Sequence, residues 1–84
     1  MADNNLADLR LEIDCCDRKI ADLLSQRLHI ARKIGKSGIK PAICDLDRES
    51  QVIANAQQAA SPELAAYIAE IYKEIIRQSR KVQE

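Results

Sequence analysis

Arg27 is the first residue that could do chemistry, because it places a permanent positive charge among apolar side chains. In the stretch SQRLHIARKIG, residues 25–35, apolar residues recur at helical spacing, and Arg27 occupies a position that would suit a leucine. Burying a guanidinium without a partner costs several kcal/mol even after the surroundings relax. Arg27 therefore needs a carboxylate within the fold, a buried stem that lets its charge reach water, or an anionic ligand.

Other polar residues interrupt the apolar faces of later segments. Ser79 and Gln83 lie four apart on an apolar stripe, and Arg48 and Glu49 lie one turn before another such stripe. Taken separately, the first two are typical of a frayed helix end, and the others of a surface charge pair worth under about 1 kcal/mol. Together with Arg27 they offer two planar forks for carboxylates, one carboxylate acceptor and neutral hydrogen-bonding groups. That set suits a small, rigid dicarboxylate that carries a hydroxyl group.

Glycine and proline are scarce, and they divide the chain into a few long helices. There are two of each among the 84 residues, at Gly35, Gly38, Pro41 and Pro62. We expect helices over about 5–37, 46–60 and 62–83, because these residue types end helices or begin them. The chain is thus predicted to be a single all-α domain, residues 1–84, without strands.

The first of these helices carries an apolar seam in which steps of three and four alternate, as in a heptad repeat. Arg27 interrupts a series made of Leu6, Leu9, Ile13, Cys16, Ile20, Leu23, Ile30 and Ile34. A helix of this length spans roughly 45 Å, and the rest of so short a chain cannot cover it. We therefore expect a homodimer in which a second copy covers the seam.

The charge balance and the cysteine content exclude several classes of protein. Thirteen basic and thirteen acidic residues cancel, and aromatic residues are limited to two tyrosines, so we expect no nucleic-acid binding. Cys15, Cys16 and Cys44 cannot pair completely and His29 is the one imidazole, so neither a disulfide framework nor a metal site is expected. The sequence shows no signal peptide or membrane span, and reduced thiols fit a cytoplasmic protein.

Five motifs occur in order along the chain. They are L-R-x-E-I-D-x-x-D from Leu9, L-L-x-x-R from Leu23, A-x-x-I-G from Ala31, D-x-x-R-E from Asp45 and I-I-x-x-S-x-x-x-Q from Ile75. Each motif alone is weak, but the ordered set covers nearly the whole chain and resembles the all-helical class of chorismate mutase. The resemblance implies an intertwined homodimer with two active sites, which rearranges chorismate to prephenate without a cofactor or a metal.

The resemblance assigns the arginines to the two carboxylates of the substrate. It implies that Arg10 comes from the partner chain and that Arg27 belongs to the same chain as the rest of the site. Arg48 would join the carboxylate-binding set or steer the substrate. Arg27 would then face the interior because a carboxylate of the substrate is its counter-ion.

Four other residues receive roles from the same resemblance. Glu49 would accept a hydrogen bond from the substrate hydroxyl. Asp45 would hold the start of the second helix and present a backbone group to that hydroxyl. Ser79 would hydrogen-bond a carboxylate, and Gln83 would donate to the ether oxygen.

The chain departs from this family at one position. The family places a lysine shortly beyond the I-G pair, where this chain has Gly38. Lys36 follows Arg27 by nine residues, which is near the opposite side of a continuous helix, whereas Lys40 can reach back if the chain turns at Gly38. We expect Lys40 to serve the ether oxygen, and we expect lower activity if neither lysine reaches it.

Three alternatives to a chorismate mutase remain at the level of the sequence. Isochorismate–pyruvate lyase is a related helical enzyme that also uses arginines to bind its substrate, although Glu49 and Gln83 favour the mutase. A domain that senses chorismate without converting it would explain the absent lysine. A plain helical dimerisation protein would leave Arg27, Ser79 and Gln83 unexplained.

Overall fold

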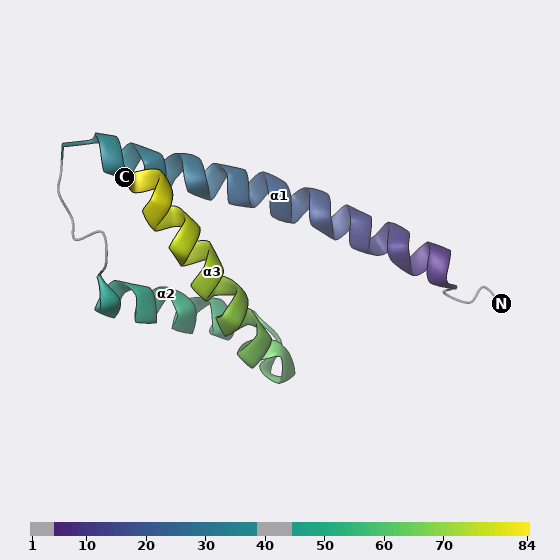
Figure 1. Ribbon diagram of the computed structural model, residues 1–84. Coiled ribbons are helices and arrows are strands. Elements are labelled where there is room, and N and C mark those ends of the chain that lie inside the picture. Colours follow the sequence, from purple (N-terminus) through teal and green to yellow (C-terminus); the bar gives the residue numbers. More distant parts are fainter. Residues whose placement is uncertain (1–4, 39–44) are drawn as a thin grey trace.

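The computed structural model describes residues 5–38 and 45–84, and all regular secondary structure in that part of the chain is helical. The elements in chain order are α1 (Leu6–Lys36), α2 (Leu46–Ala59), the short 3-10 helix η1 (Pro62–Leu64) and α3 (Ala65–Gln83). The prediction of an all-α chain with three helices is confirmed (Figure 1). No helix among the described residues has the length and apolar character of a membrane span. Lys40, Pro41 and Cys44 lie outside the described residues.

Both ends of α1 are fixed by local hydrogen bonds. At the start, Asn5 Oδ1 accepts from the backbone N–H of Asp8 at 2.9 Å, which satisfies one of the donors that a helix N-terminus leaves free. At the end, the Ser37 hydroxyl donates to the Ile34 carbonyl at 2.8 Å, and Gly38 has a φ of 83°. Residues with a side chain are strained at such a φ, so glycine suits the turn that ends this helix.

The junction between α2 and α3 differs from the predicted boundaries. α2 ends at Ala59, one residue early. Ser61 is extended, because the ring of a proline disfavours the helical conformation in the residue before it. Pro62 then opens a 3-10 turn in which the Leu64 N–H donates to the Ser61 carbonyl at 2.9 Å. The α-helix begins only at Ala65 rather than at the predicted proline, because a tight 3-10 turn commonly precedes the first α-helical turn.

α3 is the central element of the chain. It packs against both α1 and α2, whereas α1 and α2 are not packed against each other. Figure 1 shows the C-terminal end of α3 against α1 and its N-terminal part beside α2. Among the described residues, those that are buried are Ala31 on α1 and Ile76 and Ser79 on α3. The three helices therefore surround a wedge instead of closing on a large apolar core.

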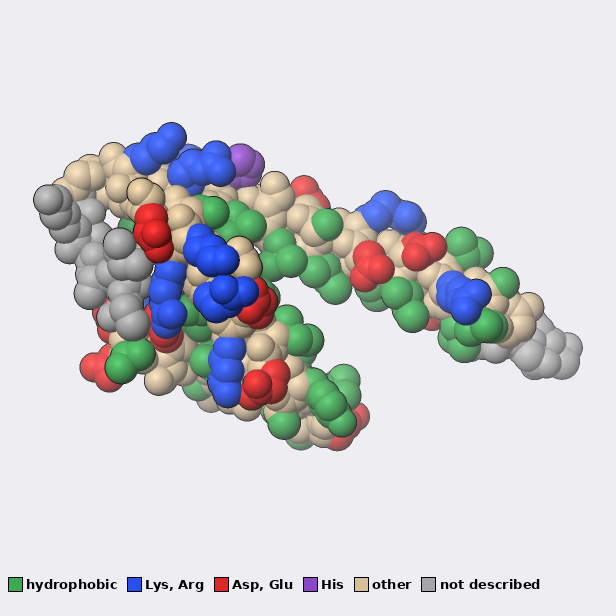
Figure 2. Space-filling model, in the orientation of Figure 1, with side chains coloured by type: hydrophobic (Ala, Val, Ile, Leu, Met, Phe, Trp, Pro, Cys, Tyr) green, Lys and Arg blue, Asp and Glu red, His purple; other side chains and the backbone are tan. Residues whose placement is uncertain are grey.

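The N-terminal half of α1 projects beyond the other helices as an arm, and the molecule measures 58 × 24 × 15 Å (Figure 1). Side chains that are 41% to 61% exposed follow the predicted seam along this arm: Leu6, Leu9, Ile13, Ile20 and Leu23. Figure 2 shows hydrophobic side chains gathered along one edge of the arm. A single chain therefore leaves the seam uncovered.

Candidate active site

The wedge between α1 and α2 forms a cavity of about 450 Å³, with α3 as its floor. That volume lies in the range of small-molecule sites. Apolar and charged side chains line it together: Arg27, Ile30, Ala31, Ile34, Asp45, Arg48, Glu49, Val52, Ile76, Ser79, Arg80 and Gln83. The cavity brings together six of the residues that the sequence predicted for a site. Of the other two, Arg10 lies elsewhere and Lys40 is outside the described residues.

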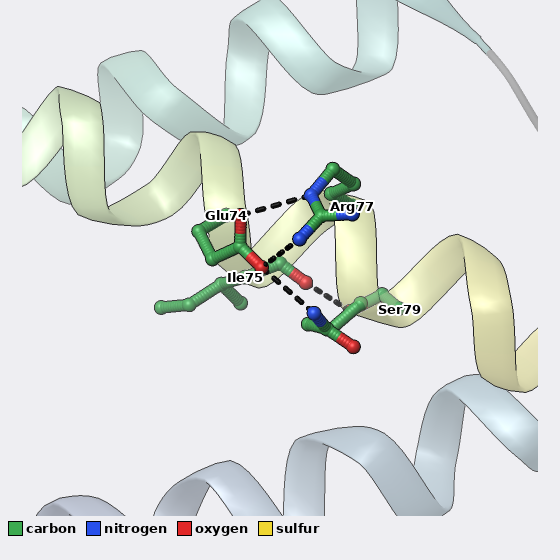
Figure 3. Close-up of polar contacts among 5 residues, drawn as sticks. Glu74, Ile75, Arg77 and Ser79 are labelled. Atoms are coloured by element: carbon green, nitrogen blue, oxygen red, sulfur yellow. Dashed lines mark hydrogen bonds and ion pairs between the residues drawn. The ribbon is translucent and has the colours of Figure 1, made fainter.

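Ser79 holds the guanidinium of Arg27. Arg27 Nη1 donates to Ser79 Oγ at 2.6 Å. The Ser79 hydroxyl donates in turn to the Ile75 carbonyl at 2.9 Å, as Figure 3 shows. A serine hydroxyl carries one proton, so its bond to Ile75 leaves a lone pair facing the arginine. Ser79 is 8% exposed, which keeps these hydrogen bonds out of solvent. The predicted contact of Ser79 with a carboxylate would require the hydroxyl to leave Ile75.

Arg27 has no carboxylate partner within the described part of the chain. None of the ion pairs between residues of that part includes it. The side chain is half-buried and lines the cavity. A guanidinium has five N–H donors, and Ser79 takes one of them. The other donors and the charge are therefore available to an anion in the cavity.

Glu49 has a partner that the sequence did not predict. Arg80 on α3 donates from Nε to Glu49 Oε2 at 2.8 Å and from Nη2 to Glu49 Oε1. The two side chains are 33% and 17% exposed, so solvent only partly screens the pair. A signal was present, because Arg80 follows Ile76 by one helical turn, just as Ser79 follows Ile75.

The start of α2 forms the rim of the cavity. The Asp45 side chain accepts from the backbone N–H of Arg48 at 3.0 Å and caps the helix on which Arg48 and Glu49 lie. Arg48 is exposed, and its Nη1 donates to Gln51 Oε1 at 3.0 Å, one turn along the same helix. Arg48 is therefore a solvated cation at the rim, whereas Arg27 is a partly desolvated cation inside.

Gln83 reaches the cavity because the end of α3 lies directly against Gly35 of α1. A Cβ atom added at Gly35 would be 2.5 Å from the Gln83 carbonyl oxygen and 2.8 Å from its Cα, which is closer than such atoms approach. Only glycine allows two backbones to come this near. Packing thus explains the glycine of the A-x-x-I-G motif.

Arg10 lies on the arm, far from the cavity of its own chain. It is exposed, and at 1.5 Å per residue it lies about 25 Å along α1 from Arg27. An arginine side chain is much shorter than that distance. Arg10 therefore cannot contact a ligand that Arg27 of the same chain holds.

Lys36 faces away from the cavity. It lines a separate hollow with His29, Arg32 and Lys33 on another face of α1, where Figure 2 shows basic side chains beside the histidine. At Gly38, where the resemblance led us to expect a lysine, the positive φ would strain any residue with a side chain. No lysine lines the cavity among the described residues.

A second group of charges on α3 lies outside the cavity. Glu74 accepts from Arg77 at 2.9 and 2.6 Å and from Gln78 at 2.7 Å (Figure 3). These hydrogen bonds, of which those from Arg77 have the larger effect, lower the pKa of Glu74 to about 2. Both members of the Arg77–Glu74 pair are more than half exposed, so the pair is a surface feature of α3.

Comparison with known proteins identifies the family. The family model for chorismate mutase type II matches residues 9–84, a span that contains every residue lining the cavity. The chain belongs to the chorismate mutase type II family. No curated protein and no solved structure matches it closely enough to add to this finding. Within residues 5–38 and 45–84 of this chorismate mutase family chain, no three His, Cys, Asp or Glu side chains are grouped to hold a metal ion.

The contact between Gly35 and Gln83 leads to a prediction about the packing of α3. Gly35→Ala should lower the midpoint of thermal unfolding, because the added methyl group pushes α3 off α1 at a cost of about 1–3 kcal/mol. Helix propensity alone predicts the opposite, since alanine favours a helix by about 1 kcal/mol over glycine. Thermal unfolding followed by circular dichroism at fixed chain concentration measures the difference. Lys33→Ala, on another face of α1, is the control and should change little; a Gly35→Ala protein that melts higher than the parent would contradict the contact.

Proposed function

We propose that this chain catalyses the intramolecular rearrangement of chorismate to prephenate. The observation that carries the proposal is the state of Arg27. It is a half-buried guanidinium that Ser79 orients toward a cavity, and no described carboxylate neutralises it. Chorismate has two carboxylates, a hydroxyl group and an ether oxygen, and these match the cations, the carboxylates and the amide that line the cavity.

The chemistry requires positioning more than reactive groups. In this reaction the ether C–O bond breaks while a C–C bond forms within the same molecule, so nothing passes to or from the protein. The enzyme holds the compact diaxial conformer in which the reacting carbon atoms meet. It also stabilises the negative charge that grows on the ether oxygen in the transition state. A cavity built on three packed helices supplies such a fixed arrangement.

We assign these tasks to the cavity residues as follows. Arg27 binds one carboxylate through its planar fork, which Ser79 already orients. Glu49 accepts a hydrogen bond from the substrate hydroxyl, and the Gln83 amide donates to the ether oxygen. Arg48 at the rim binds the second carboxylate or steers it inward.

We also propose that two chains form an intertwined homodimer with two shared active sites. Two observations support it: the apolar seam of the arm is exposed in the single chain, and Arg10 lies too far along that arm to serve its own cavity. Burial of the seam against a second copy would stabilise the arm. The same pairing would carry Arg10 to the partner's cavity, where it would complete the carboxylate-binding set.

A second candidate function is favoured by the region beyond α1. Lys36 faces another side of the helix, and Gly38 replaces the lysine of the family. Lys40 is our prediction for the cation at the ether oxygen. A domain that binds chorismate without converting it would have the same cavity and would lack that cation.

The decisive experiment follows the loss of chorismate absorbance after mixing with pure protein and identifies the product by chromatography. Prephenate is the expected product. Binding of chorismate without any product would favour the sensing domain. In a parallel assay with isochorismate, release of pyruvate would favour the lyase. Absence of both binding and turnover would contradict the proposed function.

Arg27→Ala should lower turnover by at least about a hundredfold, since it removes the fork that binds a carboxylate in a partly desolvated site. The melting temperature should hold or rise, because an unpaired and half-buried charge destabilises the empty protein. Steady-state kinetics and thermal unfolding test the two parts. Arg32→Ala, outside the cavity, is the matched control. An Arg27→Ala chain that unfolds would show that Arg27 has a structural role instead.

Sharing of sites between two chains can be tested by complementation. Arg10→Ala and Arg27→Ala should each be inactive alone, because every site then lacks one arginine. Refolding the two variants together should restore about a quarter of the wild-type activity, since half of the dimers are hybrids and each hybrid has one intact site. Activity that does not exceed the sum of the two variants would contradict shared sites.

A further inference from the structure

The pairing of Arg80 with Glu49 links two elements of the cavity. Arg80 comes from α3 and Glu49 from the first turn of α2, and the guanidinium meets both carboxylate oxygens. The Arg77–Glu74 pair has the same two-bond geometry, but it lies within α3 and outside the cavity. The two ion pairs therefore have the same hydrogen-bond geometry, but only the Arg80–Glu49 pair lines the cavity.

Glu49 raises an electrostatic difficulty for the proposed substrate. Its carboxylate lines the cavity that would receive a dianion, and like charges repel strongly where solvent screens them poorly. The side chain is 17% exposed, so water offers limited screening. A cation bound to both oxygens cancels this charge as seen from the cavity.

The geometry also leaves Glu49 able to act as an acceptor. A carboxylate has about four lone-pair sites, and Arg80 occupies two of them. The remaining sites can accept the hydroxyl proton of a ligand. At the same time, the two parallel bonds fix the plane of the carboxylate, which a single bond would leave free to rotate.

We propose that Arg80 is a positioning residue that acts through Glu49: it fixes the carboxylate plane and cancels the negative charge that Glu49 would present to a dicarboxylate substrate. This inference rests on the proposed function, because the substrate's charge is what makes the compensation necessary. Arg80 need not touch the substrate. Its contribution should therefore depend on whether residue 49 is charged.

A double-mutant cycle tests this dependence. The variants are Arg80→Gln, Glu49→Gln and the double variant, with Arg77→Gln as the control that removes the same charge from the same helix outside the cavity. Steady-state kinetics with chorismate give KM and kcat, and isothermal titration calorimetry with prephenate, also a dicarboxylate, gives binding. Calorimetry keeps the cycle measurable where Glu49→Gln turns over slowly.

We expect Arg80→Gln to raise KM, and the Kd for prephenate, by at least about tenfold, with a smaller change in kcat, because repulsion acts on the ground state and the transition state alike. Added salt should reduce the increase. In the Glu49→Gln background the same change should have little effect on either constant. Arg80→Lys should recover much of the affinity, because it restores the charge without the fork. Arg77→Gln should behave as the wild type does.

Other outcomes would overturn the inference. An equal loss of affinity in both backgrounds would mean that Arg80 binds the ligand directly. A loss of helical structure in Arg80→Gln would mean that the pair serves the fold. An unchanged Arg80→Gln protein would show that no compensation is needed. If the wild type binds prephenate but does not convert chorismate, the proposed catalytic activity is wrong, and the binding measurements still decide the role of Arg80. A wild type that neither binds prephenate nor converts chorismate would contradict both proposals.

Discussion

The hydrogen bond from Arg27 to Ser79 is the interaction on which the site depends. It fixes a cation on one helix by a hydroxyl on another, and Ile75 in turn fixes that hydroxyl through a backbone carbonyl. The direction of the guanidinium is therefore set by how α3 packs on α1. The buried apolar residues Ala31 and Ile76 belong to the same pair of helices, so the contact that folds the chain also orients the charge that we propose for binding the ligand.

α3 connects the two walls of the cavity, which do not pack on each other. Toward α1, the backbone of Gln83 rests on a glycine that permits close approach. Toward α2, Arg80 holds Glu49 across the gap. The cavity between α1 and α2 persists because specific contacts hold each of these helices to α3. The width of the cavity is thus set by how α3 crosses α1 and by how it crosses α2, and a change at either crossing should alter that width.

Periodicity predicted the helices and showed Arg27, Ser79 and Gln83 as polar residues on apolar stripes without any knowledge of the fold. The remaining cavity residues among the predictions, Asp45, Arg48 and Glu49, came from the order and spacing of the motifs. The sequence was insufficient where the answer depends on the angle between helices. Arg80 and Ser79 are neighbours on the edge of one stripe, and only the crossing of α3 with α2 decides that Arg80 meets Glu49. The glycine of the I-G motif was likewise visible, but its reason is an approach of two backbones. The 3-10 turn before α3 depends on the backbone conformation at Pro62, and the spacing of apolar residues carries no information about that conformation.

The cavity has a consequence for folding as well as for recognition. Two buried apolar side chains among the described residues make a small core, and the cavity between α1 and α2 adds no packed atoms to it. A ligand that fills this space would take the place of missing core atoms and supply the counter-charge for Arg27. A ligand that binds only the folded state stabilises it by about 2.7 kcal/mol at one hundred times its Kd. Occupancy would therefore add an appreciable fraction to the roughly 5–15 kcal/mol by which domains are stable. The amount of folded protein would then follow the supply of its own ligand.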